Sequence, residues 1–221
     1  MSNKLWKAKW KRNDIAFHQL TINPLLQQYL PNLGLAAGDR LLVPLCGKSV
    51  DMDWLSESGF RVFGIELSKI AIQAYFDALQ VKPKRQRQGR FIRWSYKKIE
   101  IWCGDIFDLT MADMHGVKAF YDSASLTALP ADSREHYVRH FSENLPTDCQ
   151  ILLLTDETPD EQQFNSVMTI DSEVSALYAA DYQIHLLHGK KCIKKDPTYP
   201  EEPKRSMEEK VYHIKRHQFS G

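Results

Sequence analysis

Cysteine is scarce in this sequence, and its spacing excludes several kinds of site. The 221 residues include four cysteines, which lie far apart without any paired spacing: Cys46, Cys103, Cys149 and Cys192. Zinc sites and thiol redox pairs need closely spaced cysteines, and small secreted domains need many of them. We therefore expect none of these sites, and we expect a protein of a reducing compartment, the cytoplasm.

An excess of charge of either sign is also missing. The 29 Lys and Arg residues nearly balance the 28 Asp and Glu residues, which leaves a formal net charge of +1. The protein therefore has no strong overall electrostatic field that would attract nucleic acid or a membrane, although a local patch of charged residues could attract either. No apolar run approaches the length of a membrane span, and the charged N-terminus lacks the apolar core of a signal peptide. These features predict a soluble protein without a membrane partner.

One stretch predicts a strand, a tight turn, a helix and a second strand. The apolar run 40–45 is followed by the turn-prone residues 46–49, and helical spacing begins at Val50. Gly59 suits the end of that helix, and a second apolar run leads to Glu66. In doubly wound sheets, an acid roughly twenty residues beyond the first turn accepts the ribose hydroxyls of a nucleoside cofactor.

The turn has only one glycine, Gly47. It lacks the three-glycine dinucleotide fingerprint and also the phosphate-binding loop that ends in Gly-Lys-Ser/Thr after four spacers. A pyrophosphate therefore fits poorly, and a nucleoside without phosphates, commonly S-adenosylmethionine, fits better. Alternatively, the turn is merely a sharp connection and Glu66 is a helix-capping acid.

Three further apolar runs predict strands with candidate residues at their carboxyl ends: Ile99–Cys103, Val117–Tyr121 and Gln150–Thr155. After the first, Asp105 could accept a hydrogen bond from the adenine amino group and Ile106 could face the ring. Alternatively, Asp105 starts an Asx turn. Asp122 and Ser123 end the second run. Two later segments predict an antiparallel pair: Tyr182–Leu187 and Lys210–Ile214.

These elements predict an α/β fold with one doubly wound, Rossmann-like sheet, mostly parallel, with an antiparallel strand near the C-terminus. We expect a single domain, residues 1–221, with an N-terminal lid and helix in 1–35 and the core in 36–221. Trp6, Trp10 and Phe17 make the lid unusually aromatic; alternatively, they dock an N-terminal helix on the sheet. A helix over 68–79 should face the core with five residues: Ile70, Ala71, Ala74, Tyr75 and Ala78.

Two polar features allow alternative interpretations. The stretch 82–98 is basic and interleaved with aromatics, which is typical of single-stranded nucleic acid binding. Alternatively, it is a solvated connection followed by a hairpin strand. His136 and His140 lie one helical turn apart, but no third ligand is placed for zinc, so we expect a solvated or capping pair.

Several motifs together resemble the thiopurine S-methyltransferase family of class I methyltransferases. They are Trp6-x-x-x-Trp10, Phe17-His18-Gln19, Val43–Ser49, Val62–Ser68, Asp105–Leu109, and the stretch from Tyr121-Asp122 to Leu129-Pro130. The resemblance implies that Trp10, Leu45 and Glu66 contact the methyl donor and that Phe17 faces the methyl acceptor. An aromatic face near a sulfonium is physically sensible, because the ring quadrupole attracts a cation.

The sequence departs from the family at the acceptor side. Ser123 stands where the family usually carries Arg, and its loss removes a bidentate donor. In the segment 160–164, where the family often has Gly-Pro-Pro-Phe, only the aromatic Phe164 is kept. We take Asp122 and Ser123 as candidates for orienting the acceptor and Phe164 as a candidate for contacting it.

The resemblance implies an S-adenosylmethionine-dependent methyltransferase that acts on a small thiol, a thiopurine or a related chalcogen. The first alternative is an RNA or nucleotide methyltransferase that uses residues 82–98. The second is a binding protein that keeps the cofactor without turnover. We expect a monomer with a small-molecule acceptor, no metal, and no nucleic-acid partner.

Overall fold

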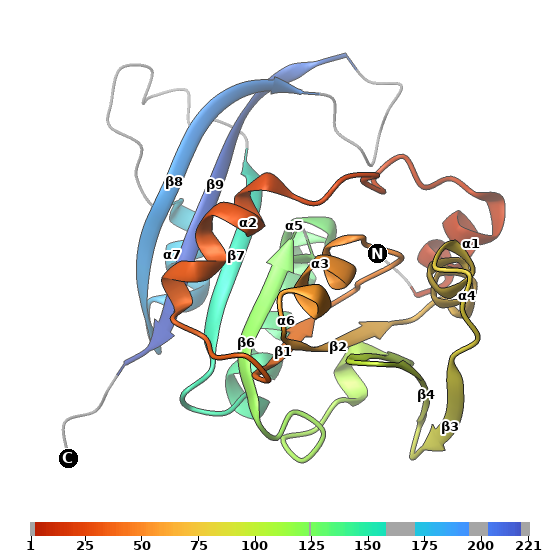
Figure 1. Cartoon of the computed structure of the whole chain (residues 1–221). Coiled ribbons are helices and arrows are strands. Elements are labelled where there is room, and N and C mark those ends of the chain that lie inside the picture. The colour runs from red at the N-terminus through yellow and green to blue at the C-terminus, as the bar shows by residue number, and fades with distance from the viewer. Residues whose placement is uncertain (1–2, 124, 158–170, 195–202, 218–221) are drawn as a thin grey trace.

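The computed structural model describes residues 3–123, 125–157, 171–194 and 203–217. Within them, one sheet of nine strands forms the centre, in the order β3-β4-β5-β2-β1-β6-β7-β9-β8 (Figure 1). The strands are β1 Arg40–Val43, β2 Arg61–Glu66, β3 Lys84–Gln88, β4 Phe91–Tyr96, β5 Ile99–Cys103, β6 Val117–Ser123, β7 Gln150–Glu157, β8 Tyr182–Lys194 and β9 Arg205–Arg216. The helices are α1 Asn3–Arg12, α2 Pro24–Tyr29, α3 Asp51–Glu57, α4 Lys69–Ala78, α5 Ser125–Ala128, α6 Ala131–Asn144 and α7 Ser172–Tyr178, with 3-10 turns η1 Leu30–Leu33 and η2 Ile106–Asp108.

The sheet has a parallel centre and antiparallel edges. Strands β5, β2, β1, β6 and β7 pair in parallel. The β3–β4 hairpin is antiparallel to β5 at one edge, and β9 and β8 are antiparallel at the other. The predicted C-terminal pair is confirmed, since Leu186 pairs with Tyr212, and both strands extend beyond the predicted segments. The expected mixed sheet is therefore correct.

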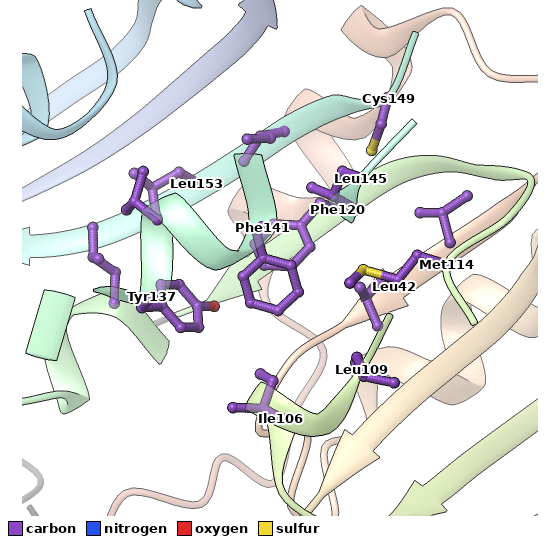
Figure 2. Packing of buried hydrophobic residues seen from close by; sticks show 14 of the residues in the cluster. Leu42, Ile106, Leu109, Met114, Phe120, Tyr137, Phe141, Leu145, Cys149 and Leu153 are labelled. Carbon is purple, nitrogen blue, oxygen red and sulfur yellow. The ribbon is translucent and has the colours of Figure 1, made fainter. Parts of the chain in front are cut away.

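Side chains alternate along each strand and give the sheet two apolar faces. Leu42 of β1 lies in the cluster under α6 and α7, whereas Leu41 and Val43 lie in the cluster under α2, α3 and α4. Figure 2 shows the first cluster, in which Phe141 of α6 packs on Phe120 of β6 with ring centroids 4.5 Å apart. Helices on both faces bury the parallel centre, as such sheets require.

The predicted inward face of α4 was correct at Ala71 and Tyr75 and wrong at Ile70. Ile70 is 50% exposed, and the buried residues of this helix are Ala71, Ile72, Tyr75 and Phe76. Polar residues at 69, 73 and 77 mark the outward side of the helix, and the apolar Ile70 and Phe76 flank them on opposite sides, so the predicted stripe and the observed one have the same spacing and differ by one residue. Packing against β2 and β5 selects between them, and periodicity could not.

The basic stretch forms the β3–β4 hairpin, with all five residues of β3 exposed. This is the alternative that we gave for it, a solvated connection and a hairpin strand. Charged side chains on an edge strand oppose pairing with other chains.

Among the described residues, no helix is both long and apolar enough to cross a membrane.

Candidate functional site

The site lies where the direction of winding reverses. β1 pairs with β2 on one side and with β6 on the other, so the carboxyl ends of these three strands meet at the switch point of the sheet. Ligands of doubly wound sheets bind outside the carboxyl ends of the strands at such a point. The predicted residues on the loops after β1, β2, β5 and β6 are thereby brought to one edge.

The turn after β1 has a strained backbone. Leu45 has a φ of 43° and Gly47 a φ of 53°, both in the left-handed region. For a residue with a Cβ this conformation costs about 1–2 kcal/mol. A hydrogen bond of 3.1 Å from the Cys46 amide to the Ile65 carbonyl ties the turn to the end of β2. Strain held in this way is found at ligand sites, where a backbone must approach a ligand closely.

Glu66 links the turn to the start of α4. Its side chain is 6% exposed, and Oε2 accepts from the Gly47 amide at 2.9 Å while Oε1 accepts from the Ser68 amide at 2.6 Å. Burial raises the pKa of Glu66, and these amides act against that rise. Ser68 is the N-cap of α4, so the alternative of a capping acid also describes part of what Glu66 does.

Glu66 nevertheless fits the ribose of a nucleoside cofactor. A carboxylate has about four lone-pair directions, and the two amides use one on each oxygen. Each oxygen can still accept a hydroxyl, which is what a ribose diol offers. The free acceptor positions of the Glu66 carboxylate therefore suit S-adenosylmethionine, whose ribose carries two neighbouring hydroxyls and whose nucleoside carries no phosphate.

Asp105 and Ile106 follow β5 on the neighbouring strand end. The Gly104 amide donates to the Glu66 carbonyl at 3.0 Å, which brings the two acidic residues to adjacent positions. The Asp105 carboxylate accepts from the Phe107 amide at 3.1 Å and caps η2, the Asx turn that we gave as its alternative. Ile106 is 5% exposed and packs in the core near α6 (Figure 2). Their contacts with adenine stay predictions.

The N-terminal aromatics gather over the turn. Trp10 is 6% exposed, and a Cβ placed on Gly47 would lie 3.1 Å from its ring. Phe17 meets both tryptophans edge to face, with centroid distances of 5.9 Å to Trp10 and 5.5 Å to Trp6. α1 lies beside α4 (Figure 1). The N-terminal helix is thus docked on the core beside α4, and a lid over a ligand stays a prediction.

Asp122 and Ser123 differ sharply in their surroundings. Asp122 is fully buried and accepts from the Tyr137 hydroxyl at 2.8 Å and the Ser125 amide at 2.7 Å. Burial raises its pKa to about 6, against the effect of these donors. Ser123 is exposed at the end of β6. Asp122 therefore holds α5 and α6, and its predicted action on an acceptor would be indirect. Phe164 lies outside the described residues.

Sequence reasoning missed two connections beneath the site. The buried Asp51 accepts from the Tyr121 hydroxyl at 2.9 Å and from the Asn23 amide at 2.8 Å, which joins α3 to β6 and to the segment before α2. The expected solvated pair holds for His136, which is exposed, but not for the half-buried His140, and both rings also contact Phe107. In the sequence, an acidic residue in the first turn of α3 was the only indication of the contacts made by Asp51. Nothing in the sequence indicated that the two histidines pack on Phe107.

Solved structures with this architecture define its class. A Burkholderia thailandensis 1,6-didemethyltoxoflavin-N1-methyltransferase with bound S-adenosylhomocysteine aligns with a TM-score of 0.62 at 14% identity, over 96% of this chain and 87% of that one. An S-adenosylmethionine-dependent methyltransferase from Anabaena variabilis gives 0.60 at 12% identity, over 97% and 95%. The fold is that of class I S-adenosylmethionine-dependent methyltransferases.

Sequence comparison identifies the family within that class. The model of the family described as "Thiopurine S-methyltransferase (TPMT)" matches residues 1–217. A thiopurine S-methyltransferase of Azotobacter vinelandii is 38% identical over 217 residues, 98% of this chain and 100% of the relative. One of Pseudomonas syringae is 49% identical over 155 residues, 70% of each chain. The chain belongs to the thiopurine S-methyltransferase family, and it is a methyltransferase whose methyl donor is S-adenosylmethionine.

Proposed function

We propose that this enzyme methylates the sulfur of a small thiol or thiopurine, or a related chalcogen. The observation that carries the proposal is the aromatic cluster of Trp6, Trp10 and Phe17 over the Gly47 turn. Aromatic faces suit both a sulfonium and a soft, polarisable acceptor. The names of the relatives, thiopurine S-methyltransferases, support the same acceptor class.

Each residue has a defined task in this mechanism. Glu66 would accept the ribose hydroxyls, the turn at Leu45–Gly47 would lie under the methionine end of the donor, and Trp10 would pack on it. When bound, S-adenosylmethionine would supply a methyl carbon: the anionic acceptor sulfur would form a bond to it in line as the bond from that carbon to the sulfonium breaks, and S-adenosylhomocysteine would leave as a neutral thioether. Phe17 would face the acceptor sulfur and exclude water from it. Alignment of the acceptor sulfur, the methyl carbon and the leaving sulfur would supply much of the rate acceleration. An acceptor that is already acidic needs no protein base.

The basic hairpin does not favour the alternative of an RNA methyltransferase. Arg85 stacks over Trp94 at 3.8 Å and donates to Gln73. Arg90 pairs with Asp108, and Arg93 is paired as well. These guanidinium groups therefore stabilise the protein's own edge and adjoining loop.

Turnover with a panel of acceptors tests the acceptor class. Purified protein and S-adenosylmethionine are incubated with thiopurines, aromatic thiols, sulfide, selenite and tellurite, and release of S-adenosylhomocysteine is measured. Methylation of at least one member is expected. Donor binding without turnover on any of them would contradict the proposal and favour a binding protein.

Calorimetric titration of S-adenosylhomocysteine tests the donor site separately. Replacing Glu66 by Ala removes the carboxylate that accepts the ribose hydroxyls, and we expect binding weaker by about ten- to a hundredfold. Unchanged affinity in this variant would place the ribose elsewhere. We further propose a cytoplasmic location, since no disulfide joins the cysteines of the described residues, and a monomer, which sedimentation would test.

A further inference from the structure

The loop after β5 lies beside Glu66 and is held at both ends. We call residues Gly104–Asp108 the η2 loop. A Cβ on Gly104 would lie 2.3 Å from the ring of Phe91, so β4 packs directly against the start of the loop. At its other end, Asp108 pairs with Arg90 of the hairpin at 2.5 Å, although Arg90 is 79% exposed and such pairs contribute little.

The middle of the η2 loop is held by two imidazole rings of α6. The His136 ring stacks on Phe107 with centroids 4.4 Å apart and an interplanar angle of 6°. The His140 ring meets Phe107 edge to face at 5.5 Å and also contacts Phe141 at 5.3 Å. Nε2 of His140 is buried without a hydrogen-bond partner in the described residues, and the ring interacts with the backbone of Ile106 as well as with the two aromatic rings.

α6 itself is fixed in the core. Tyr137 and Phe141 are buried (Figure 2). The Tyr137 hydroxyl donates to Asp122 at the end of β6. α6 therefore contacts both the end of β6, where the methyl acceptor is proposed to bind, and the η2 loop, where the methyl donor is proposed to bind. Movement of Phe107 would displace Asp105, whose carboxylate accepts from the Phe107 amide.

We propose that His136 and His140 are positioning residues for the methyl donor: by packing on Phe107, His136 face to face and His140 edge to face, they hold Asp105 and Ile106 where the adenine ring binds. The proposal rests on the donor site described under the proposed function. Aromatic pairs contribute roughly 0.5–1.5 kcal/mol beyond their buried area, so the loss of one stack corresponds to a change of about two- to tenfold in donor affinity.

The test uses three variants of α6. His136→Ala removes the stack, His136→Phe keeps a flat ring there, and Arg139→Ala is a matched control because Arg139 pairs with Glu135 on the exposed side of the same helix. We expect S-adenosylhomocysteine to bind His136→Ala about two- to tenfold more weakly, while His136→Phe and Arg139→Ala bind like wild type. The KM for the acceptor should not change in any of them.

Amide hydrogen exchange of the donor-free protein gives a second readout. Exchange in the η2 loop should be faster in His136→Ala than in His136→Phe or Arg139→Ala, and the loss of the stack should lower the melting temperature of His136→Ala by only about 1–6 °C. Wild-type affinity and exchange in His136→Ala would overturn this proposal alone. If wild type failed to bind S-adenosylhomocysteine, or if Glu66→Ala bound it unchanged, the donor site itself would fail.

Discussion

At the scale of single residues, two glycines with the same backbone conformation have different surroundings. Gly47 has a φ of +53° and lies under the Trp10 ring, whereas Gly89 in the hairpin turn has a φ of +56° and open space where a Cβ would be. Any side chain at either position strains the backbone. Only at Gly47 would it also displace the Trp10 ring.

Replacing each glycine by Ala separates these two effects. We expect both variants to lose about 1 kcal/mol of unfolding free energy from strain. Gly47→Ala should in addition weaken binding of S-adenosylhomocysteine, because Trp10 must move by a few tenths of an ångström, while Gly89→Ala should bind like wild type. Urea unfolding and calorimetry measure the two quantities, and equal donor affinity in both variants would contradict a role for the Trp10 contact.

His213 gives the molecule a predictable response to acid. Burial, followed by the charges of Lys215 and His185, lowers its pKa to about 4, and Nε2 lies 2.8 Å from Gln150 Oε1. An unfolded His titrates near 6.5, so between pH 6.5 and 4 the unfolded state holds the extra proton. Stability from His213 is therefore complete above pH 6.5 and falls as the pH drops toward 4, by up to about 1.4 kcal/mol per pH unit.

We expect His213→Gln to lose less unfolding free energy than wild type between pH 7 and pH 5. Asp122, whose pKa is raised to about 6, acts in the opposite direction over part of this range, so the comparison between variants isolates His213. The exposed His115 provides the control, and His115→Gln should follow wild type. Parallel pH profiles for His213→Gln and wild type would contradict the assignment.

At the scale of elements, α6 is the helix that joins the two sides of the site. Its buried Tyr137 donates to Asp122 at 2.8 Å while its ring packs on Phe120 and Phe141. The hydroxyl can be removed without leaving a large cavity. Asp122 would then keep the two main-chain donors at the start of α5, Ser125 and Leu126.

Tyr137→Phe should destabilise the protein by about 1–3 kcal/mol, because a buried carboxylate loses one of its donors. The pKa of Asp122 should rise further for the same reason. A double-mutant cycle with Asp122→Asn, measured by chemical denaturation, isolates the pair. If the cost of Tyr137→Phe were the same in the Asp122→Asn background, the hydrogen bond would contribute nothing measurable.

At the scale of the whole molecule, the proposed donor and acceptor sites together draw on five separate segments of the chain. The N-terminal aromatics, the turn after β1, Glu66, the η2 loop and the end of β6 meet at one edge of the sheet. A ligand that contacts all of them stabilises the folded state as a unit. Unfolding must then release the ligand, which raises the melting temperature.

S-adenosylhomocysteine at a hundred times its Kd should stabilise the wild-type protein by about 2.7 kcal/mol. For a chain of this length that corresponds to a rise of about 5–10 °C in Tm. Differential scanning calorimetry measures it, and Glu66→Ala at the same ligand concentration should show a much smaller rise. Equal shifts for both proteins would contradict the ribose contact.

Features that depend on neighbours in the chain were predictable. The strand, turn and helix that lead to Glu66 and the C-terminal antiparallel pair follow from local patterns. The buried face of α4 did not, because Ile70 and Ile72 are equally apolar and only packing distinguishes them.

The sequence by itself determined the family, the parallel centre of the sheet and the positions of the residues at its strand ends, because spacing and chain order fix which residues end each strand. Only the tertiary structure decided that Asp122 is buried while Ser123 is exposed, and that His136 stacks on Phe107. These outcomes depend on side chains that meet across long stretches of chain, and their contacts leave no local pattern in the sequence.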